Sequence, residues 1–179
     1  MSRVRVYMAC SFDGYVAGPE DDLSWLEVER PDAPPADPGA LGFEAFIADV
    51  GALLMGRRTH DVVKGLGLWM YGERPVLVAT RRPLEPAAPS VRPVEGSIEA
   101  MVEEARRAAA GGDVYVDGAD LVRQALDAGL VDELTLTFVP VLLGGGVSLF
   151  GGLTRRQDLE ITAHHRYAQG MVQLTARPR

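Results

Sequence analysis

Apolar residues recur along the chain with two periodicities, one typical of strands and one typical of helices. Short β-rich runs, most of them followed by glycine or polar residues, predict strands at 4–9, 53–56, 75–80, 113–116 and 134–139. Helical spacing, capping residues and terminating glycines predict helices at 43–50, 57–66, 97–110 and 120–128. Strands and helices therefore alternate over most of the chain.

Two segments depart from this alternation. Residues 31–40 are rich in proline, which predicts an irregular surface loop over about 28–41. Residues 159–167 and 171–176 alternate in polarity around Gln169-Gly170, which predicts a hairpin. We therefore expect one domain over residues 1–179, a three-layer α/β/α fold with a mostly parallel central sheet and a C-terminal antiparallel hairpin.

Composition limits the kinds of partner that we expect the protein to bind. The formal net charge of −7 argues against nucleic acid and against anionic membrane surfaces. Lys64 is the only lysine, so an anion site must be built from arginine. The single cysteine excludes an internal disulfide, and His164 and His165 point to opposite faces of a predicted strand, so no metal site is predicted. We find no long apolar run and expect a cytoplasmic protein.

The predicted strand at 53–56 ends at Gly56, and Arg57, Arg58 and Thr59 follow where a helix begins. The start of a helix offers free N–H groups and a partial positive charge, and arginine forks onto phosphate oxygens. The predicted strand at 75–80 ends similarly in arginines. These residues favour a phosphate site, although a turn with solvated arginines is an equally good interpretation of Gly56 to Thr59 alone.

Five motifs occur in a characteristic order. They are Ser11–Gly18, Gly56–Thr59, Val116–Ala119, Val131–Leu134 with Thr137 and Pro140, and Leu143–Phe150. In this order they resemble the dihydrofolate reductase-like superfamily, most closely the branch that contains the reductase domain of the riboflavin-biosynthesis deaminase-reductase. In that branch an acid precedes the glycine pair, as Asp117 does here, although the second glycine of the pair is Ala119.

The resemblance implies NADP(H) as the cofactor, with hydride transfer to a pteridine- or pyrimidine-like ring. The residues at the family's cofactor positions are Ala9, Val16, Gly56, Arg57, Arg58, Thr59, Thr80, Arg81, Gly118, Ala119, Asp120 and Leu121. His60 lies behind the arginines on the same predicted helix and is expected to be exposed.

Asp117 and Asp13 are the candidate catalytic acids. An acid at the end of a central strand faces the cleft and has a raised pKa, although Asp117 could instead cap the next helix. Asp13 could bind substrate hydroxyls or fix its own turn. The candidate substrate-binding residues are Asp13, Trp25, Phe46, Asp117 and Thr137. The two aromatic residues could instead belong to the hydrophobic core, and the threonine could instead be a structural residue of its strand.

These features predict an NADPH-dependent reductase, similar to 5-amino-6-(5-phosphoribosylamino)uracil reductase, that binds a small heterocyclic substrate and forms a homodimer. One alternative is a non-catalytic nucleotide- or heterocycle-binding protein of the same fold. Another is a dihydrofolate reductase, for which Glu44 is the only acid available at the family's pterin-binding position.

Overall fold

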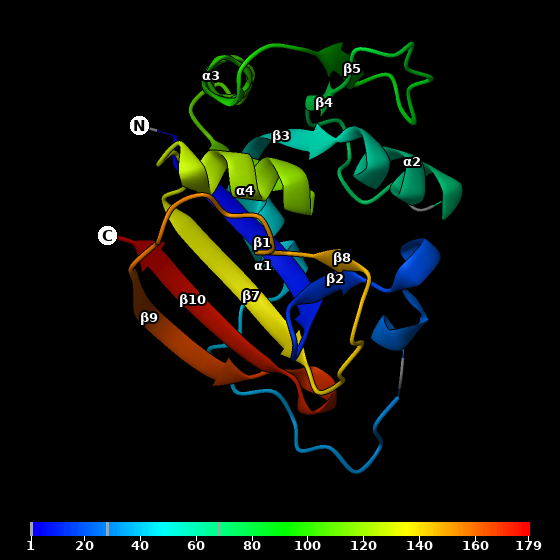
Figure 1. Ribbon diagram of the computed structural model, residues 1–179, viewed down its shortest axis with the longest axis vertical. Coiled ribbons are helices and arrows are strands. Elements are labelled where there is room, and N and C mark those ends of the chain that lie inside the picture. Colours follow the sequence, from blue (N-terminus) through cyan, green and yellow to red (C-terminus); the bar gives the residue numbers. More distant parts are fainter. Residues whose placement is uncertain (1, 28, 68) are drawn as a thin grey trace.

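Parallel strand pairing organises the part of the chain that the computed structural model describes, residues 2–27, 29–67 and 69–179. The strands are β1 (Val4–Ser11), β2 (Tyr15–Ala17), β3 (Val50–Gly56), β4 (Val76–Ala79), β5 (Val91–Val94), β6 (Asp113–Asp117), β7 (Glu133–Val139), β8 (Val147–Ser148), β9 (Leu159–Arg166) and β10 (Val172–Pro178). The helices are α1 (Phe43–Ala48), α2 (Arg57–Gly65), α3 (Ile98–Ala108) and α4 (Ala119–Asp127), with short 3-10 helices η1 (Pro19–Asp21), η2 (Ser24–Leu26) and η3 (Ala168–Gly170). Eight of the described strands form a sheet in the order β5-β4-β3-β6-β1-β7-β10-β9, seen in Figure 1.

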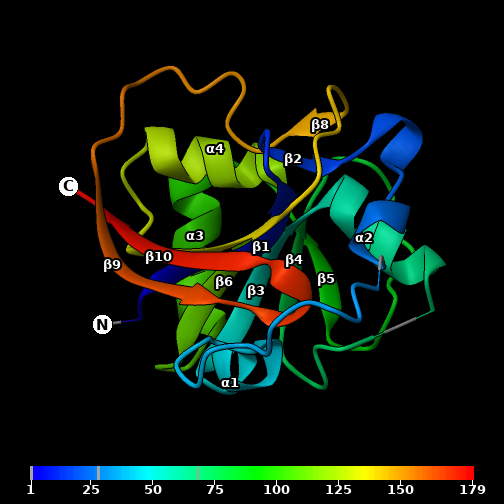
Figure 2. The same ribbon diagram turned by 90° about the horizontal axis from the view of Figure 1, so that it is seen from below.

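Strand alternation divides the core into two layers. In β3, Leu54 faces the apolar cluster formed with α3 and α4, whereas Leu53 and Met55 face a second cluster formed with α1. Figure 2 shows α3 and α4 on one face of the sheet and α1 on the other. Central parallel strands are buried on both faces because successive side chains point to opposite sides and helices cover both. The predicted three-layer fold is confirmed.

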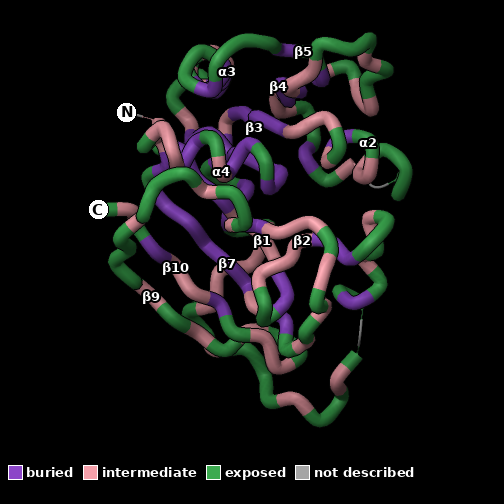
Figure 3. The backbone as a smooth tube through the Cα atoms, in the orientation of Figure 1, coloured by how far each residue is buried: buried purple, intermediate pink, exposed green. Residues whose placement is uncertain are grey.

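The C-terminal hairpin closes one edge of the sheet. Strand β10 pairs antiparallel with both β7 and β9, and Gln169 at the tip has a positive φ of 59°. The outer strand β9 is largely exposed, whereas β7 is buried (Figure 3). The predicted hairpin is therefore correct, and β9 is the outermost strand of the sheet.

The proline-rich loop contains no helix or strand in its described part, residues 29–41; residue 28 lies outside the described residues. Two of its residues, Asp37 and Leu41, are held to the hairpin. The backbone N–H of Leu41 donates to Gln173 Oε1 and its carbonyl accepts from Gln173 Nε2, at 2.7 and 2.9 Å. Asp37 accepts hydrogen bonds from the backbone and guanidinium of Arg166. The loop thus lies along the sheet edge as an ordered surface segment.

Three expectations about single elements were wrong or incomplete. Val50 opens β3 rather than ending the preceding helix, because α1 stops at Ala48. His60 is fully buried rather than exposed, since it lies on the inner face of α2 with Nδ1 3.1 Å from Asp61 Oδ1. Strand β5 and the two-stranded β2–β8 sheet were not predicted, because two to four residues give no measurable period.

A buried ionic cluster joins the amino ends of β1, β6 and β7. The Arg5 guanidinium lies 2.8 Å from Glu133 Oε1, 3.5 Å from Asp113 Oδ2 and 4.7 Å above the Phe46 ring. All three charged residues are buried, so each charge depends on its partners for solvation. Arg3, which is half exposed, adds a second contact to Asp113 at 2.7 Å.

We predict that Arg5→Ala lowers the free energy of unfolding by about 3 kcal/mol, because it leaves buried carboxylates short of a cation. Urea denaturation measures the change. Arg156→Ala removes an arginine with 86% side-chain exposure and an Asp158 partner at 2.7 Å, so its effect should stay below about 1 kcal/mol. Equal losses in the two variants would contradict the assignment.

Candidate functional site

A cavity of about 750 Å³ opens at the carboxyl ends of the parallel strands β1, β3, β4, β5 and β6. The strand register aligns these ends, since Gly56 of β3 pairs with Ala79 of β4 and Met55 of β3 pairs with Asp117 of β6. Every residue predicted to hold the cofactor lines this cavity: Ala9, Val16, Gly56, Arg57, Arg58, Thr59, Thr80, Arg81, Gly118, Ala119, Asp120 and Leu121. Crevices at this edge are the usual ligand sites of parallel sheets.

Two helices begin at the cavity. Gly56 is the N-cap of α2 and Gly118 is the N-cap of α4, and neither end has a side-chain cap. Their first N–H groups are therefore free to bind an anion. Gly118 has a φ of 104°, and a Cβ there would lie 2.6 Å from Thr59 Oγ1. The backbone between the two helix starts is thus open only because residue 118 is glycine.

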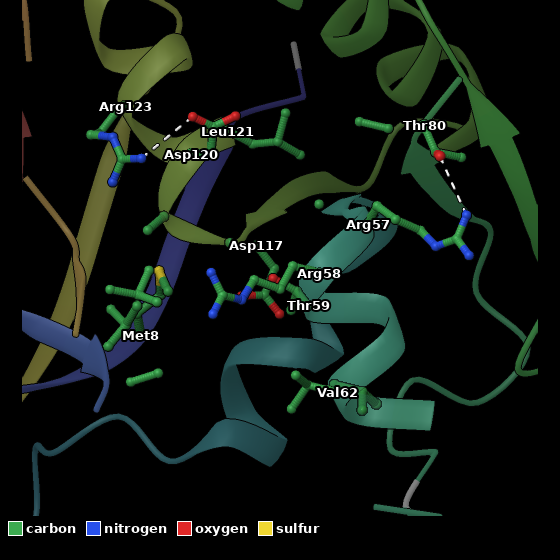
Figure 4. A pocket seen from close by; sticks show the side chains of 18 of the residues that line it. Met8, Arg57, Arg58, Thr59, Val62, Thr80, Asp117, Asp120, Leu121 and Arg123 are labelled. Carbon is green, nitrogen blue, oxygen red and sulfur yellow. Dashed lines mark hydrogen bonds and ion pairs between the residues drawn. The ribbon is translucent and has the colours of Figure 1, made fainter. Parts of the chain in front are cut away.

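The arginines around these helix starts have different surroundings. Figure 4 shows Arg57 and Arg58 leaving α2 in opposite directions. Arg57 binds Asp61 at 2.9 Å and donates to the Pro83 carbonyl at 2.8 Å and to Thr80 Oγ1 at 3.4 Å.

On the other side of the helix start, Arg58 lies 2.6 Å from Asp21 Oδ1. Arg81 is exposed and forms no ion pair within the described chain. Arg123, which sequence reasoning missed, lines the cavity and donates to the Ser148 carbonyl at 2.6 Å.

Asp117 lies in the wall of the cavity below the helix starts (Figure 4). Burial raises the pKa of its carboxyl group to about 6, while hydrogen bonds from Tyr115, the Gly118 N–H and Tyr71 lower it by less. Because Gly118 and not Asp117 is the N-cap of α4, the capping alternative is excluded. A carboxyl group with such a pKa holds a proton in weakly acidic solution and releases it near neutrality.

The apolar surroundings of Asp117 are aromatic. Tyr115 lies two residues earlier on the same face of β6, and burial raises the pKa of its hydroxyl group well above the usual value. Phe46 stacks on Tyr7 at 4.6 Å and meets Tyr115 edge-on at 5.0 Å. Strand periodicity could have identified Tyr115 from the sequence, whereas Tyr71 comes from a loop and carries no such signal.

Four candidate substrate-binding residues are not among those that line the cavity. Trp25 and Phe46 are buried in the core, and Thr137 accepts a hydrogen bond from Gln173 inside the sheet. Asp13 accepts from Ser11 Oγ at 2.6 Å and from the N–H groups of Leu143 and Gly144 at 3.1 and 2.7 Å.

The hydrogen bond from Ser11, followed by the bond from the Gly144 N–H, lowers the pKa of the Asp13 carboxyl group to about 2. The geometry therefore favours the structural alternative for these four residues. Among the described residues we find no cluster of three His, Cys, Asp or Glu side chains suited to a metal, and no helix long and apolar enough to cross a membrane.

The sequence of residues 60–173 matches the RibD C-terminal domain. The chain belongs to this family. The match begins within α2, so the matched residues do not include Gly56 to Thr59. Family and fold, first inferred from the order of motifs, are confirmed.

Two proteins are similar to this chain over nearly its full length. The uncharacterized Bacillus subtilis protein YwjB is 25% identical over 93% of this chain and 92% of its own. The crystal structure of a putative riboflavin biosynthesis protein from Shewanella sp. PV-4 has a TM-score of 0.82 and 29% identity, with 99% of both chains covered.

A diaminohydroxyphosphoribosylaminopyrimidine deaminase/5-amino-6-(5-phosphoribosylamino)uracil reductase from Thermotoga maritima has a TM-score of 0.66 and 14% identity. The chain spans 57% of that protein's length, and this likeness shows the fold alone.

We predict that Asp117→Asn changes how stability depends on pH. The folded pKa of about 6 exceeds the ordinary value of 3.8, so the wild-type contribution is full below 3.8 and is lost as pH rises through 6. The free energy of unfolding of the wild type should fall relative to the variant by about 3 kcal/mol between about pH 4 and pH 7. Urea titrations across this range measure it.

Asp13→Asn is the matched comparison. Because the pKa of Asp13 is lowered rather than raised, its contribution to stability changes with pH in the opposite direction. The Asp13 carboxylate stabilises the fold above its ordinary pKa of 3.8 and loses that contribution as pH falls towards 2. A difference between wild type and Asp117→Asn that does not vary with pH would contradict burial of an ionisable Asp117.

Proposed function

We propose that this protein is an NADPH-dependent reductase of a pyrimidine- or pteridine-like heterocycle. The observation that carries the proposal is the joining of two chemistries in one cavity. Two uncapped helix starts with arginines suit the phosphates of a dinucleotide, and a buried acid with a pKa of about 6 suits proton transfer. A cofactor and an acid on one cavity wall are what reduction of a ring double bond requires.

The residues present fit the cofactor. The N–H groups at the starts of α2 and α4, together with the space above Gly118, would hold the pyrophosphate. Thr80 and Arg81 at the end of β4, with Arg57 beside them, would hold the 2′-phosphate of the adenosine. Ala9 and Val16 offer small apolar contacts for the nicotinamide side. When bound, NADPH supplies the hydride.

Asp117 would supply the proton. Below a pH of about 6 its carboxyl group is protonated and could donate that proton to a nitrogen of a bound heterocycle. The aromatic side chains behind it exclude water, which keeps the proton on the acid until a substrate accepts it. Exposed Glu44 of α1 does not line the cavity, which speaks against the pterin carboxylate of a dihydrofolate reductase.

Family membership supports a reductase-like activity, and the names of the Shewanella and Thermotoga proteins support a pyrimidine of the riboflavin type as the starting point for substrate tests. The substrate, the homodimer and the cytoplasmic location stay predictions.

The test is whether the protein oxidises NADPH in the presence of pyrimidine and pteridine compounds. Oxidation is measured as the loss of NADPH absorbance. We expect Asp117→Asn to lower kcat about 100-fold while NADPH binding persists, because the amide cannot donate an acidic proton. Asp158→Asn, an exposed acid remote from the cavity, is the control and should match wild type. NADPH binding without oxidation of any ring compound would instead support the non-catalytic alternative.

We predict that Arg81→Ala weakens NADPH binding about tenfold and leaves NADH binding unchanged, because it removes a charged donor to the 2′-phosphate. Calorimetric titration of both nucleotides measures the difference. Arg82→Ala is matched in charge, exposure and position along the chain, but Arg82 does not line the cavity. Equal losses for NADPH and NADH, or an equal effect of Arg82→Ala, would place the 2′-phosphate elsewhere.

A further inference from the structure

We propose that the ring compound bound in this cavity carries no phosphate group. The proposal rests on the proposed reductase function and adds the class of substrate. It follows from where the cavity has cations and where it has none.

The cavity has two contrasting walls. One wall consists of the helix starts and the arginines around them, where a dinucleotide's phosphates would lie. The other, which we call the apolar wall, consists of Leu23, Leu26, Val62, Val63 and Leu66. In Figure 4, Val62 lies on the opposite side of Asp117 from Asp120 and Leu121. A substrate held beside Asp117 would therefore meet the apolar wall on the side that faces away from the start of α4.

The charges that residues 18–27 place beside the apolar wall are negative, and Lys64, next to Val63 on α2, is bound to Glu85 at 3.0 Å. Residues 18–27, which carry η1 and η2 across from α2 in Figure 1, contain Glu20, Asp21, Asp22 and Glu27 and no lysine or arginine. Among the described residues that line the cavity, Arg58 is the cation on this side, and Asp21 holds it at 2.6 Å. A phosphate dianion here would have to displace Asp21 from Arg58 and would face the neighbouring carboxylates.

The rim of the apolar wall is exposed. Leu26 is 41% exposed and Leu66 is 58% exposed. Exposed leucines at the mouth of a cavity gain from contact with an uncharged substituent and give nothing to a phosphate, whose desolvation must be repaid by charged donors. The wall thus selects an uncharged substituent on the ring.

This arrangement separates the chain from the Thermotoga protein, whose name specifies a phosphoribosylamino group on the substrate. The two chains share a fold, and on this proposal the apolar wall is what distinguishes their substrates.

Equilibrium dialysis of the protein, alone and with NADP⁺, tests the proposal. The probes are 5-amino-6-(5-phosphoribosylamino)uracil and the same compound after enzymatic removal of its phosphate. We expect the dephosphorylated compound to bind about tenfold more tightly. Equal or tighter binding of the phosphorylated compound overturns the proposal, and so does binding of neither compound.

Two variants make the test specific. Leu26→Arg should improve binding of the phosphorylated compound about fivefold, as expected for one exposed cation near an anion. Leu159→Arg adds the same charge at a leucine of similar exposure, 42%, on β9 away from the cavity, and should change neither affinity. An equal gain in both variants would mean that only overall charge matters, which also overturns the proposal.

NADPH binding, followed separately by thermal shift, distinguishes this inference from the proposed function. Binding and oxidation of NADPH with a preference for the phosphorylated compound would overturn the inference alone. Tight binding of the dephosphorylated compound by a protein that does not bind NADPH would support the inference and overturn the proposed reductase.

Discussion

The register of three neighbouring parallel strands brings every group of the candidate site together. Gly56 pairs with Ala79 and Met55 pairs with Asp117, so two helix starts, the arginines after β4 and one acid meet at a single edge. A shift of one residue in β6 would turn the Asp117 side chain to the opposite face, away from the aromatic cluster. The site therefore depends on the same pairing that buries Leu53 and Leu54 in the two core layers.

The two ends of the sheet use buried charge in opposite ways. At the amino ends, Arg5 is matched by Glu133 and Asp113, and the charges offset one another. At the carboxyl ends, Asp117 has hydroxyl and amide donors but no cation within the interactions that shift its pKa. Burial without a cation raises the pKa of a carboxyl group, whereas ion pairing opposes that effect. The absence of a basic partner is thus what keeps Asp117 able to carry a proton.

Motifs that follow strands predicted well which residues line the cavity, because a strand end and a helix start are both visible in local sequence. Four of the candidate substrate-binding residues, in contrast, do not line it. Phe46 has the residue type of a stacking aromatic, yet it lies beneath Tyr7 and Tyr115 in the core. Asp13 has the residue type of a catalytic acid, yet its oxygens hold the loop at Leu143 and Gly144, and nothing local to Asp13 specifies that loop. His60 was misplaced because four charged residues on α2 obscured its buried face.

The contrast between the two cavity walls bears on how a protein with a net charge of −7 would bind the anionic cofactor that we propose. Arg57, Arg58, Arg81 and Arg123 line the cavity, and their local charge would offset the net negative charge of the chain there. Here the pairing of Arg58 with Asp21 marks the border between the two regions: on one side the helix starts and Arg81 favour negative charge, and on the other the leucines and the carboxylates of residues 18–27 disfavour it. On the two proposals made here, the distribution of charge along one cavity admits a phosphorylated cofactor and disfavours a phosphate group on the substrate.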